Sequence, residues 1–353
     1  GRQPLYMWGI AGVGKTELAM EFARRQPYKA YLVSFRGTMK ETILQMDFAN
    51  YSFRYEGGSD SREQEYRDRL SILKTDYAGT LLIVDNFDSE TADIAKLQQE
   101  PAFKEITGLD LHVLFTTRSR PDATTPELGA FSEQAAFTLF TKIVYDDTDG
   151  GSKIIIPDDE EKNIRELLRE IDYHPLTVEL AARAVCDSWN TITPQNLLTR
   201  FKFNVVHRDN RTAKIYEQIR TLFNLYSFDE EYREVLAHVT LLPVDGIDAA
   251  LILGSEDGAK KNHLKRIESR GFVRRRKEDN RLKIHPLIRS VIKNEIAPTY
   301  ADCDEFLTAL WKNFDDTYPP NFSLYRQGAE VYENAEKNFR DSRSISSYRA
   351  GHC

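Results

Sequence analysis

A glycine-rich stretch near the start of the chain constrains the fold more than any other feature. Residues 9–16 read GIAGVGKT, which has the pattern GxxxxGK[ST]. The short apolar run Leu5–Trp8 precedes it, and in residues 16–25, which follow, the apolar side chains recur with the period of a helix. The sequence therefore predicts a strand, a tight loop and a helix in succession, which is the setting of a phosphate-binding loop.

The residue types of this loop suit a bound phosphate group. A loop that wraps a phosphate turns successive main-chain N–H groups inward, and glycine permits the necessary dihedral angles and close approach. The helix that follows adds its positive end, a lysine in the loop reaches the β- and γ-phosphates, and a threonine hydroxyl ligates Mg²⁺. A glycine-rich turn without a ligand is the alternative. The predicted nucleotide-binding residues of the loop are Gly9, Ala11, Gly12, Val13, Gly14, Lys15, Thr16 and Glu17.

A buried strand further along supplies an acidic residue for the metal. Residues 81–84 (LLIV) are apolar, and Asp85 follows them. An aspartate in this place alone more often caps a turn, but downstream of a phosphate loop it is expected to bind Mg²⁺ together with Thr16. Hydrolysis also needs a carboxylate that orients water. Asn86 cannot accept a proton and Asp88 could act only if its loop turned inward, so we expect slow or conditional hydrolysis.

An arginine follows a fourth predicted strand, at residues 111–116. From this place Arg118 can face the γ-phosphate and so distinguish ATP from ADP, although a surface arginine at a strand end is the alternative. The candidate catalytic residues are Asp85, Asp88 and Arg118.

Short apolar runs alternate with helical stretches in the first third of the chain. The runs occupy residues 5–8, 30–35, 80–84 and 111–116. This alternation favours a parallel sheet covered on both faces, hence an α/β P-loop NTPase domain. Helical periodicity dominates afterwards, and two segments around Gly271 and residues 281–284 predict a hairpin that closes a three-helix core.

The sequence thus predicts an α/β P-loop domain followed by an all-α domain and a winged-helix domain. We expect a P-loop nucleotide-binding domain at residues 1–126, a small helical domain at 127–205, a winged helix at 206–297, and the start of a helical repeat or linker region at 298–353.

Charge and cysteine content argue against several kinds of function. The net charge of −7 argues against a general nucleic-acid surface, and the basic stretch at residues 270–277 (RGFVRRRK) is of a kind that usually forms solvated strand ends. Cys186, Cys303 and Cys353 are too far apart for a zinc site or a disulfide framework, so a cytoplasmic location is expected. No apolar run approaches the roughly 20 residues of a membrane span. Both ends are expected to be cuts through a longer protein.

These motifs, in this order, resemble the STAND NTPases and within them the NB-ARC type, the switch ATPases of plant resistance receptors, apoptosome scaffolds and many bacterial proteins. The resemblance covers about residues 4–296. Each of the last three motifs is unspecific alone, but the order and spacing of all five are specific. The motifs are GIAGVGKTELA as the P-loop, LLIVDNFD as the Walker B motif, VLFTTRSR as the sensor strand, HPLTVELA as the GLPLA segment and IHPL as the MHD motif.

The resemblance implies an ASCE-type parallel sheet and roles for residues outside the P-loop domain. Pro175, followed by Leu176, would lie against the adenine and ribose. His285 would reach from the winged helix to the β-phosphate of ADP and lock a closed state; without the family it would more often be a core or capping histidine. Two residues depart from the motifs, because His174 replaces a glycine and Pro286 replaces the MHD aspartate. Bacterial members with tetratricopeptide repeats often show the HPL form, so such repeats are expected beyond residue 300.

The resemblance implies a signalling switch in defence or signal transduction. ADP would lock the closed form, a ligand sensed by C-terminal repeats outside this chain would open it, and ATP-bound subunits would then self-associate and signal through an unknown N-terminal effector. No membrane contact is expected, and DNA is not the expected partner. One alternative is an ATP-dependent transcription regulator whose winged helix and residues 274–277 touch DNA. Another is a rapidly cycling ATPase, against which Asn86 and the lack of an evident arginine finger beyond Arg118 count.

Overall fold

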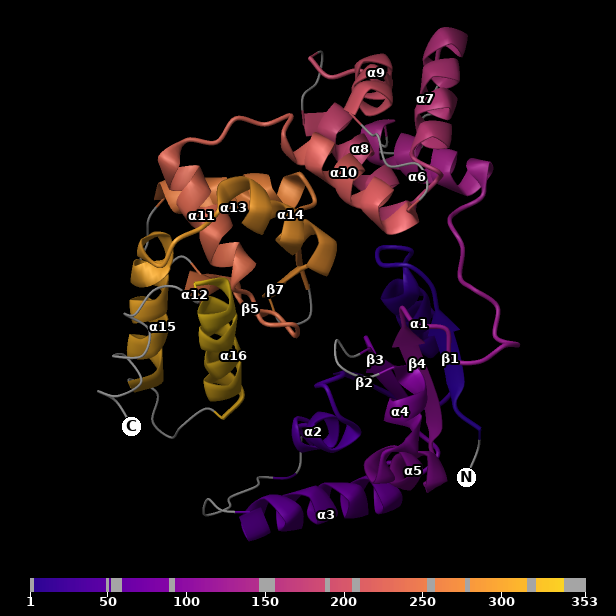
Figure 1. The fold of residues 1–353 in the computed structure, drawn as a ribbon, viewed down its shortest axis with the longest axis vertical. Helices are drawn as coiled ribbons and strands as arrows, with labels where there is room; N and C mark the ends of the chain where they lie inside the picture. The colour runs from indigo at the N-terminus through magenta and orange to yellow at the C-terminus, as the bar shows by residue number, and fades with distance from the viewer. Residues whose placement is uncertain are drawn as a thin grey trace. The chain divides into compact units, whose positions relative to one another are not determined.

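A computed structural model describes ten stretches of the chain, which forms two compact units, Gly1–Gly129 and Ala130–Cys353 (Figure 1). The described residues are 3–48, 51, 59–88, 93–145, 156–187, 191–204, 210–252, 258–276, 280–315 and 322–339.

The first unit is built on a parallel four-stranded sheet in the order β1-β4-β3-β2. Because all four strands run the same way, their carboxyl ends meet at one edge of the sheet. Each strand begins and ends within one residue of its predicted position, and the predicted α/β P-loop domain is confirmed. The strands are β1 (Leu5–Trp8), β2 (Ala30–Ser34), β3 (Leu81–Asp85) and β4 (His112–Thr117).

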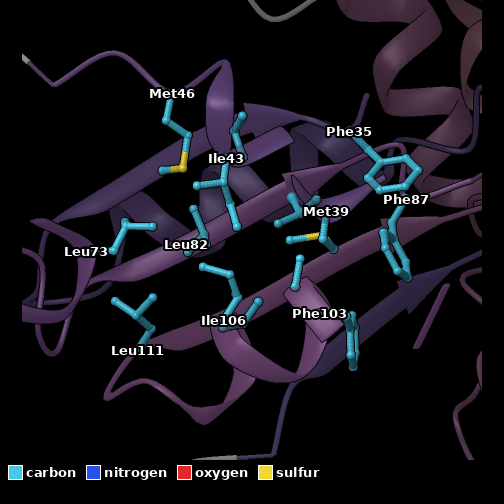
Figure 2. Close-up of a cluster of buried hydrophobic side chains, with 14 of the residues drawn as sticks. Phe35, Met39, Ile43, Met46, Leu73, Leu82, Phe87, Phe103, Ile106 and Leu111 are labelled. Atoms are coloured by element: carbon cyan, nitrogen blue, oxygen red, sulfur yellow. The ribbon is translucent and has the colours of Figure 1, made fainter. Parts of the chain in front are cut away.

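Helices cover both faces of this sheet. Successive side chains of β3 point to opposite faces and pack in two different cores. Leu81 and Ile83 pack with Ala19 of α1, whereas Leu82 and Val84 belong to the larger core on the opposite face (Figure 2). Burial of each of these leucine, isoleucine and valine side chains contributes roughly 1.5–3 kcal/mol to the stability of the fold. The helices of this unit are α1 (Lys15–Arg24), α2 (Met39–Leu44), α3 (Ser59–Thr75), α4 (Ile94–Gln99) and α5 (Pro101–Gly108).

The segment after β4 covers the outer edge of β1, the strand that leads into the glycine loop. Trp8 forms a parallel bridge with Glu127, its carbonyl accepts from the N–H of Leu128 at 2.8 Å, and its indole Nε1 donates to the carbonyl of Thr125 at 2.9 Å. A Cβ on Gly9 would lie 2.6 Å from the carbonyl oxygen of Leu128. Gly9 is therefore required by the close approach of this segment.

The second unit begins with a group of packed helices. The apolar residues keep a helical period through residues 164–185, which predicts one helical stretch, but two helices occupy this range. The break follows from the backbone, because Asp172 and Tyr173 have positive φ angles of 51° and 54° and Pro175 cannot continue a preceding helix. The sequence also predicts an acidic, glycine-containing loop at residues 145–161. Residues 146–155 of it lie outside the described residues, and residues 158–161 are helical. The helices are α6 (Glu133–Tyr145), α7 (Asp158–Glu170), α8 (Pro175–Asp187), α9 (Pro194–Asn204) and α10 (Arg211–Phe223).

A second group of helices packs with a small antiparallel sheet in the order β5-β7-β6. The predicted hairpin is confirmed as β6 (Val273–Arg275) and β7 (Arg281–Ile284), whereas the two-residue strand β5 (Ile247–Asp248) was not predicted. The helices here are α11 (Glu230–Thr240), α12 (Ala249–Ile252), α13 (Gly258–Ser269) and α14 (Pro286–Ile296).

The last described segments are helical, as predicted from residue 300 onward. The short 3-10 helix η1 (Ala301–Cys303) leads into α15 (Asp304–Asp315), which lies beside α16 (Phe322–Asn338) (Figure 1). Within the described stretches, no helix combines the length and the apolar character needed to cross a bilayer.

Candidate functional site

The glycine loop lies between the end of β1 and the start of α1, as the sequence predicts. Gly12 and Gly14 have left-handed φ angles of 80° and 98°, which glycine adopts without strain. Gly14 is the N-cap of α1, and no side chain caps that helix. The main-chain N–H groups of its first turn are thus placed to receive an anion.

The side chain of Lys15 folds back over the loop and is buried, with 7% of its surface exposed. Its Nζ donates to the carbonyl oxygens of Gly9 at 2.8 Å and Ile10 at 3.0 Å, which uses two of its three protons. Burial lowers the pKa of Lys15, and this outweighs the opposing effect of the nearby Asp88 carboxylate. Among the described residues, the hydrogen-bond acceptors of this ammonium group are carbonyl oxygens, and the carboxylates of Asp88 and Asp85 act on it only through space.

Asp85 ends β3 and lies beside the loop, with 7% of its surface exposed. Its Oδ1 accepts hydrogen bonds from the hydroxyls of Thr16 at 2.7 Å and Thr116 at 2.6 Å. The two predicted Mg²⁺ ligands, Thr16 and Asp85, are therefore in contact. A hydroxyl and a carboxylate are both oxygen donors of the kind that Mg²⁺ prefers, so this donor set fits the ion.

Thr116 of β4 was not predicted as a site residue. Besides donating to Asp85, its Oγ1 accepts from the main-chain N–H of Asn86 at 2.9 Å. Asn86 itself has a left-handed φ of 56° and donates from Nδ2 to Oδ2 of Asp85 at 3.2 Å. A threonine that ends the apolar run of residues 111–116 is the sequence signal that could have identified it, and in the structure this threonine is fully buried.

The carboxylate of Asp88 accepts hydrogen bonds from the end of β4. Its Oδ1 accepts from Thr117 Oγ1 at 2.8 Å, from Arg118 N at 2.9 Å and from Ser119 N at 3.3 Å. Its Oδ2 accepts from Arg118 N at 3.0 Å and from Arg118 Nε at 3.3 Å. The three predicted catalytic side chains thus lie at the carboxyl edge of the sheet, with Asp88 and Arg118 paired to each other.

The remaining predicted residues belong to the second unit and begin two of its helices. Pro175 and Leu176, both buried, open α8, and Nδ1 of the preceding His174 lies 3.0 Å from Thr177 Oγ1. His285 is the N-cap of α14, where its Nδ1 accepts from the N–H of residue 287 at 3.2 Å. In α14 a histidine cap thus precedes proline at the first helical position, which is a favourable start for a helix.

The basic stretch near residue 270 is engaged within the second unit. Arg270 lies over the ring of Tyr226, 3.8 Å from its centroid, and its Nε lies 2.9 Å from Asp187 at the end of α8. Lys277 lies outside the described residues. Three arginines of the stretch form ion pairs, Arg270 with Asp187, Arg274 with Glu179 and Arg275 with Glu268.

Comparison with known proteins identifies a fold. No protein-family model matches the chain, and no curated protein matches it. A solved structure of a Signal Transduction ATPase with Numerous Domains (STAND) protein with a tetratricopeptide repeat sensor, from Pyrococcus horikoshii, is similar over 100% of this chain, with a TM-score of 0.55 and 16% identity. The chain spans 48% of that protein. This likeness shows a STAND-like P-loop NTPase fold.

Two weaker similarities accompany it. Cdc6p from Pyrobaculum aerophilum matches with a TM-score of 0.31 and 12% identity, over 83% of this chain and 87% of that one. A chain of the Drosophila ORC bound to DNA matches with a TM-score of 0.30 and 14% identity, over 84% of this chain and 91% of that one.

Proposed function

We propose that the chain is a nucleotide-dependent signalling switch of the NB-ARC type that binds ADP or ATP together with Mg²⁺. The observation that carries this proposal is the buried ammonium group of Lys15, which contacts two loop carbonyls and, among the described residues, no carboxylate. A buried charge is costly unless an opposite charge compensates it. The phosphates of a nucleotide supply that charge, and the uncapped amides of α1 supply further donors.

Each predicted site residue has a role in this proposal. Residues 9–17 hold the phosphates, and Thr16 and Asp85 hold Mg²⁺, which neutralises charge on the β- and γ-phosphate oxygens when bound. In the second unit, Pro175 and Leu176 would contact the base. Because Nδ1 of His285 accepts a main-chain N–H, a neutral ring carries its proton on Nε2, and this donor suits the β-phosphate of ADP.

The residues after β3 favour slow hydrolysis and therefore a switch over a rapidly cycling ATPase. Asn86 is an amide, and both carboxylate oxygens of Asp88 accept donors from β4. A carboxylate so engaged is poorly placed to take a proton from an attacking water. A site that binds nucleotide tightly and hydrolyses it slowly retains one nucleotide state long enough to signal.

The domain organisation supports a switch that spans several parts of the chain. We propose the P-loop domain at residues 1–126, the helical domain at 127–205, the winged helix at 206–297 and the start of helical repeats at 298–353. The three helices α11, α13 and α14 with the sheet β5-β7-β6 support the winged-helix assignment. If nucleotide contacts come from three domains, exchange of ADP for ATP changes which arrangement is stable, and this differential contact is what allostery requires.

The proposed cycle depends on parts of a longer protein. A sensor beyond this chain would bind an unknown ligand, the closed ADP form would open, and ATP-bound copies would associate and act through an N-terminal effector.

The nucleotide retained by the purified protein tests the proposal. We expect ADP, close to one per chain, when the protein is denatured and the released nucleotide is identified by chromatography. Lys15→Met protein should release none. A protein that carries no nucleotide and binds none, or one that turns over many ATP per minute, would contradict the switch.

A further inference from the structure

We propose that Asp88 is a positioning residue that acts through Arg118 and thereby sets the preference of the site for ATP over ADP. This inference rests on the proposed function, because it concerns the nucleotide bound at the same site. It assigns Asp88 the task of holding Arg118, in place of the proton transfer predicted for it from the sequence.

The division of contacts between the two oxygens of Asp88 carries this inference. Oδ1 receives Thr117 Oγ1, Arg118 N and Ser119 N at 2.8–3.3 Å, so it fixes the backbone where β4 ends. Oδ2 receives Arg118 N at 3.0 Å and the side-chain Nε of the same arginine at 3.3 Å. One oxygen thus holds the backbone, and the other also holds the guanidinium group.

The two side chains of this pair differ in exposure, as expected if Asp88 is fixed and Arg118 can move. The Asp88 side chain is 6% exposed, whereas that of Arg118 is 55% exposed. A carboxylate offers about four lone-pair sites, and five donor contacts already occupy those of Asp88. The buried acid is therefore fixed, and the arginine is the part that can turn toward a ligand.

This pair lies close enough to the phosphate loop to act on a nucleotide. The N–H of Gly9 donates to the carbonyl of Thr117 at 3.2 Å, so the end of β4 is attached to the first residue of the loop. Asp88 and Arg118 are also the two charged groups with the largest effects on the pKa of Lys15, after the effect of burial.

The consequence is a competition for one guanidinium group. With ADP bound, Arg118 rests on Oδ2 of Asp88. The γ-phosphate of ATP offers a second anionic partner, and in this proposal Arg118 releases its Nε contact when the guanidinium group turns toward the phosphate. Asp88 therefore lowers the affinity for ATP by binding the arginine side chain. Its hydrogen bonds to the backbone at the end of β4 keep Arg118 close to the γ-phosphate position.

Asp88→Asn separates these two effects. The amide oxygen can replace Oδ1 and keep its three contacts with residues 117–119, whereas the amide NH₂ in the place of Oδ2 cannot accept from Arg118 N or Nε. We expect the ratio of ATP affinity to ADP affinity to rise about two- to fivefold, the range that corresponds to a partly exposed ion pair. Asp88→Ala also loses the backbone contacts, and its ratio should fall below that of the wild type.

A double-mutant cycle with Arg118→Gln tests whether Asp88 acts through the arginine. Affinities for ATP and ADP are measured by calorimetry for the wild type, both single variants and the double variant, with thermal melting to show that each is folded. We expect Asp88→Asn to leave the ratio unchanged when Arg118 is already Gln. The same rise in both backgrounds, or no rise in either, would overturn the inference.

Two further outcomes are distinct. If Asp88→Asn lowers turnover a hundredfold and leaves the affinity ratio unchanged, Asp88 is the general base and the positioning role is wrong. If the wild type binds neither nucleotide, the proposed function itself fails before the cycle begins.

Discussion

Each unit of the chain buries a lysine, and the partners of the two ammonium groups differ. In the first unit, Nζ of Lys15 contacts only carbonyl oxygens among the described residues, and burial lowers its pKa. In the second unit, Nζ of Lys260 lies 2.8 Å from Glu234 and 2.7 Å from Glu305. Burial alone would lower the pKa of Lys260, but the hydrogen bonds that its Nζ donates to the two glutamates raise it.

A similar contrast holds for acidic side chains. The buried Asp85 accepts from two hydroxyls and one amide, all neutral groups, whereas the more exposed acids Glu179 and Asp187 of the second unit are paired with arginines. A nucleotide with its metal brings both missing charges, phosphate for Lys15 and a cation for Asp85. The difference teaches that neutral partners around buried charges indicate a binding site, and that ion pairs such as those of Lys260 indicate structure. The pair of Asp88 with Arg118 is the exception, because its arginine is exposed and can turn toward a ligand.

The largest effect that can break this comparison is that of Lys15→Met. We expect ATP affinity to fall about a thousandfold, roughly 4 kcal/mol, because charge-assisted hydrogen bonds to two phosphates are lost. Thermal stability without nucleotide should stay the same or rise, since a buried charge that has no ion-pair partner among the described residues is removed. Calorimetric titration and a melting curve measure both. Lys260→Met is the matched control and should bind ATP as the wild type does; equal losses in the two variants would break the comparison.

The next largest effect is the dependence of stability on pH, which we expect from His238 in the second unit. Burial lowers the pKa of His238 to about 4, although Glu234 opposes this. The folded protein keeps the ring neutral while the unfolded chain takes up a proton near its ordinary pKa of 6.5. The free energy of unfolding should therefore fall by up to about 3 kcal/mol as the pH drops from 6.5 to 4. Urea titrations at several pH values measure this.

His238→Gln provides the control for this pH dependence. Glutamine can donate to the carbonyl of Asp302 as Nε2 of His238 does at 3.0 Å, but it does not titrate. The variant should lose less stability on acidification than the wild type. Parallel pH profiles for the two proteins would show that His238 is not the titrating group.

A smaller effect is expected when the ion-paired lysine is removed. Lys260→Met leaves Glu234, whose side chain is 29% exposed, without its counter-ion, whereas Glu305 is 62% exposed and can be solvated. We expect a loss of about 1–2 kcal/mol in the free energy of unfolding, which is less than for a fully buried pair. Chemical denaturation measures it. The exposed neighbour Lys261, replaced in the same way, should change stability by less than about 0.5 kcal/mol.

Sequence was sufficient for the strands and the phosphate loop of the first unit because their signals are local. The loop from Gly9 to Thr16 has its own pattern, and the strands are continuous apolar runs that end at polar residues such as Asp85. The helices α2, α4 and α5 were not predicted, since each is at most eight residues long and leaves too little periodicity to detect.

The contacts that organise the site could not be predicted, because they join residues far apart in the chain. Asp88 and Arg118 are separated by 30 positions, and so are Asn86 and Thr116. Only the neighbouring position of β3 and β4 in the sheet brings these pairs together. In the second unit, α7 and α8 have the same helical periodicity, so the sequence suggested one continuous stretch. The break before Pro175 could not be seen from that periodicity. For His285, the capping role left open by the sequence is the one that its Nδ1 adopts.

The smallest expected effect tests whether the arginines of the second unit are structural or bind DNA. The Arg274 side chain is 51% exposed and is paired with Glu179, so Arg274→Gln should lower the free energy of unfolding by less than about 1 kcal/mol. Fluorescence anisotropy with a DNA duplex, measured over a range of salt concentrations, should detect no difference from the wild type or from the exposed control Lys265→Gln. If Arg274 contacted a phosphate, the salt dependence of binding would weaken by about one unit of slope in the Arg274 variant alone. That result would make this arginine part of a binding surface, and the rule that ion-paired charges mark structure would then hold only for the buried ones.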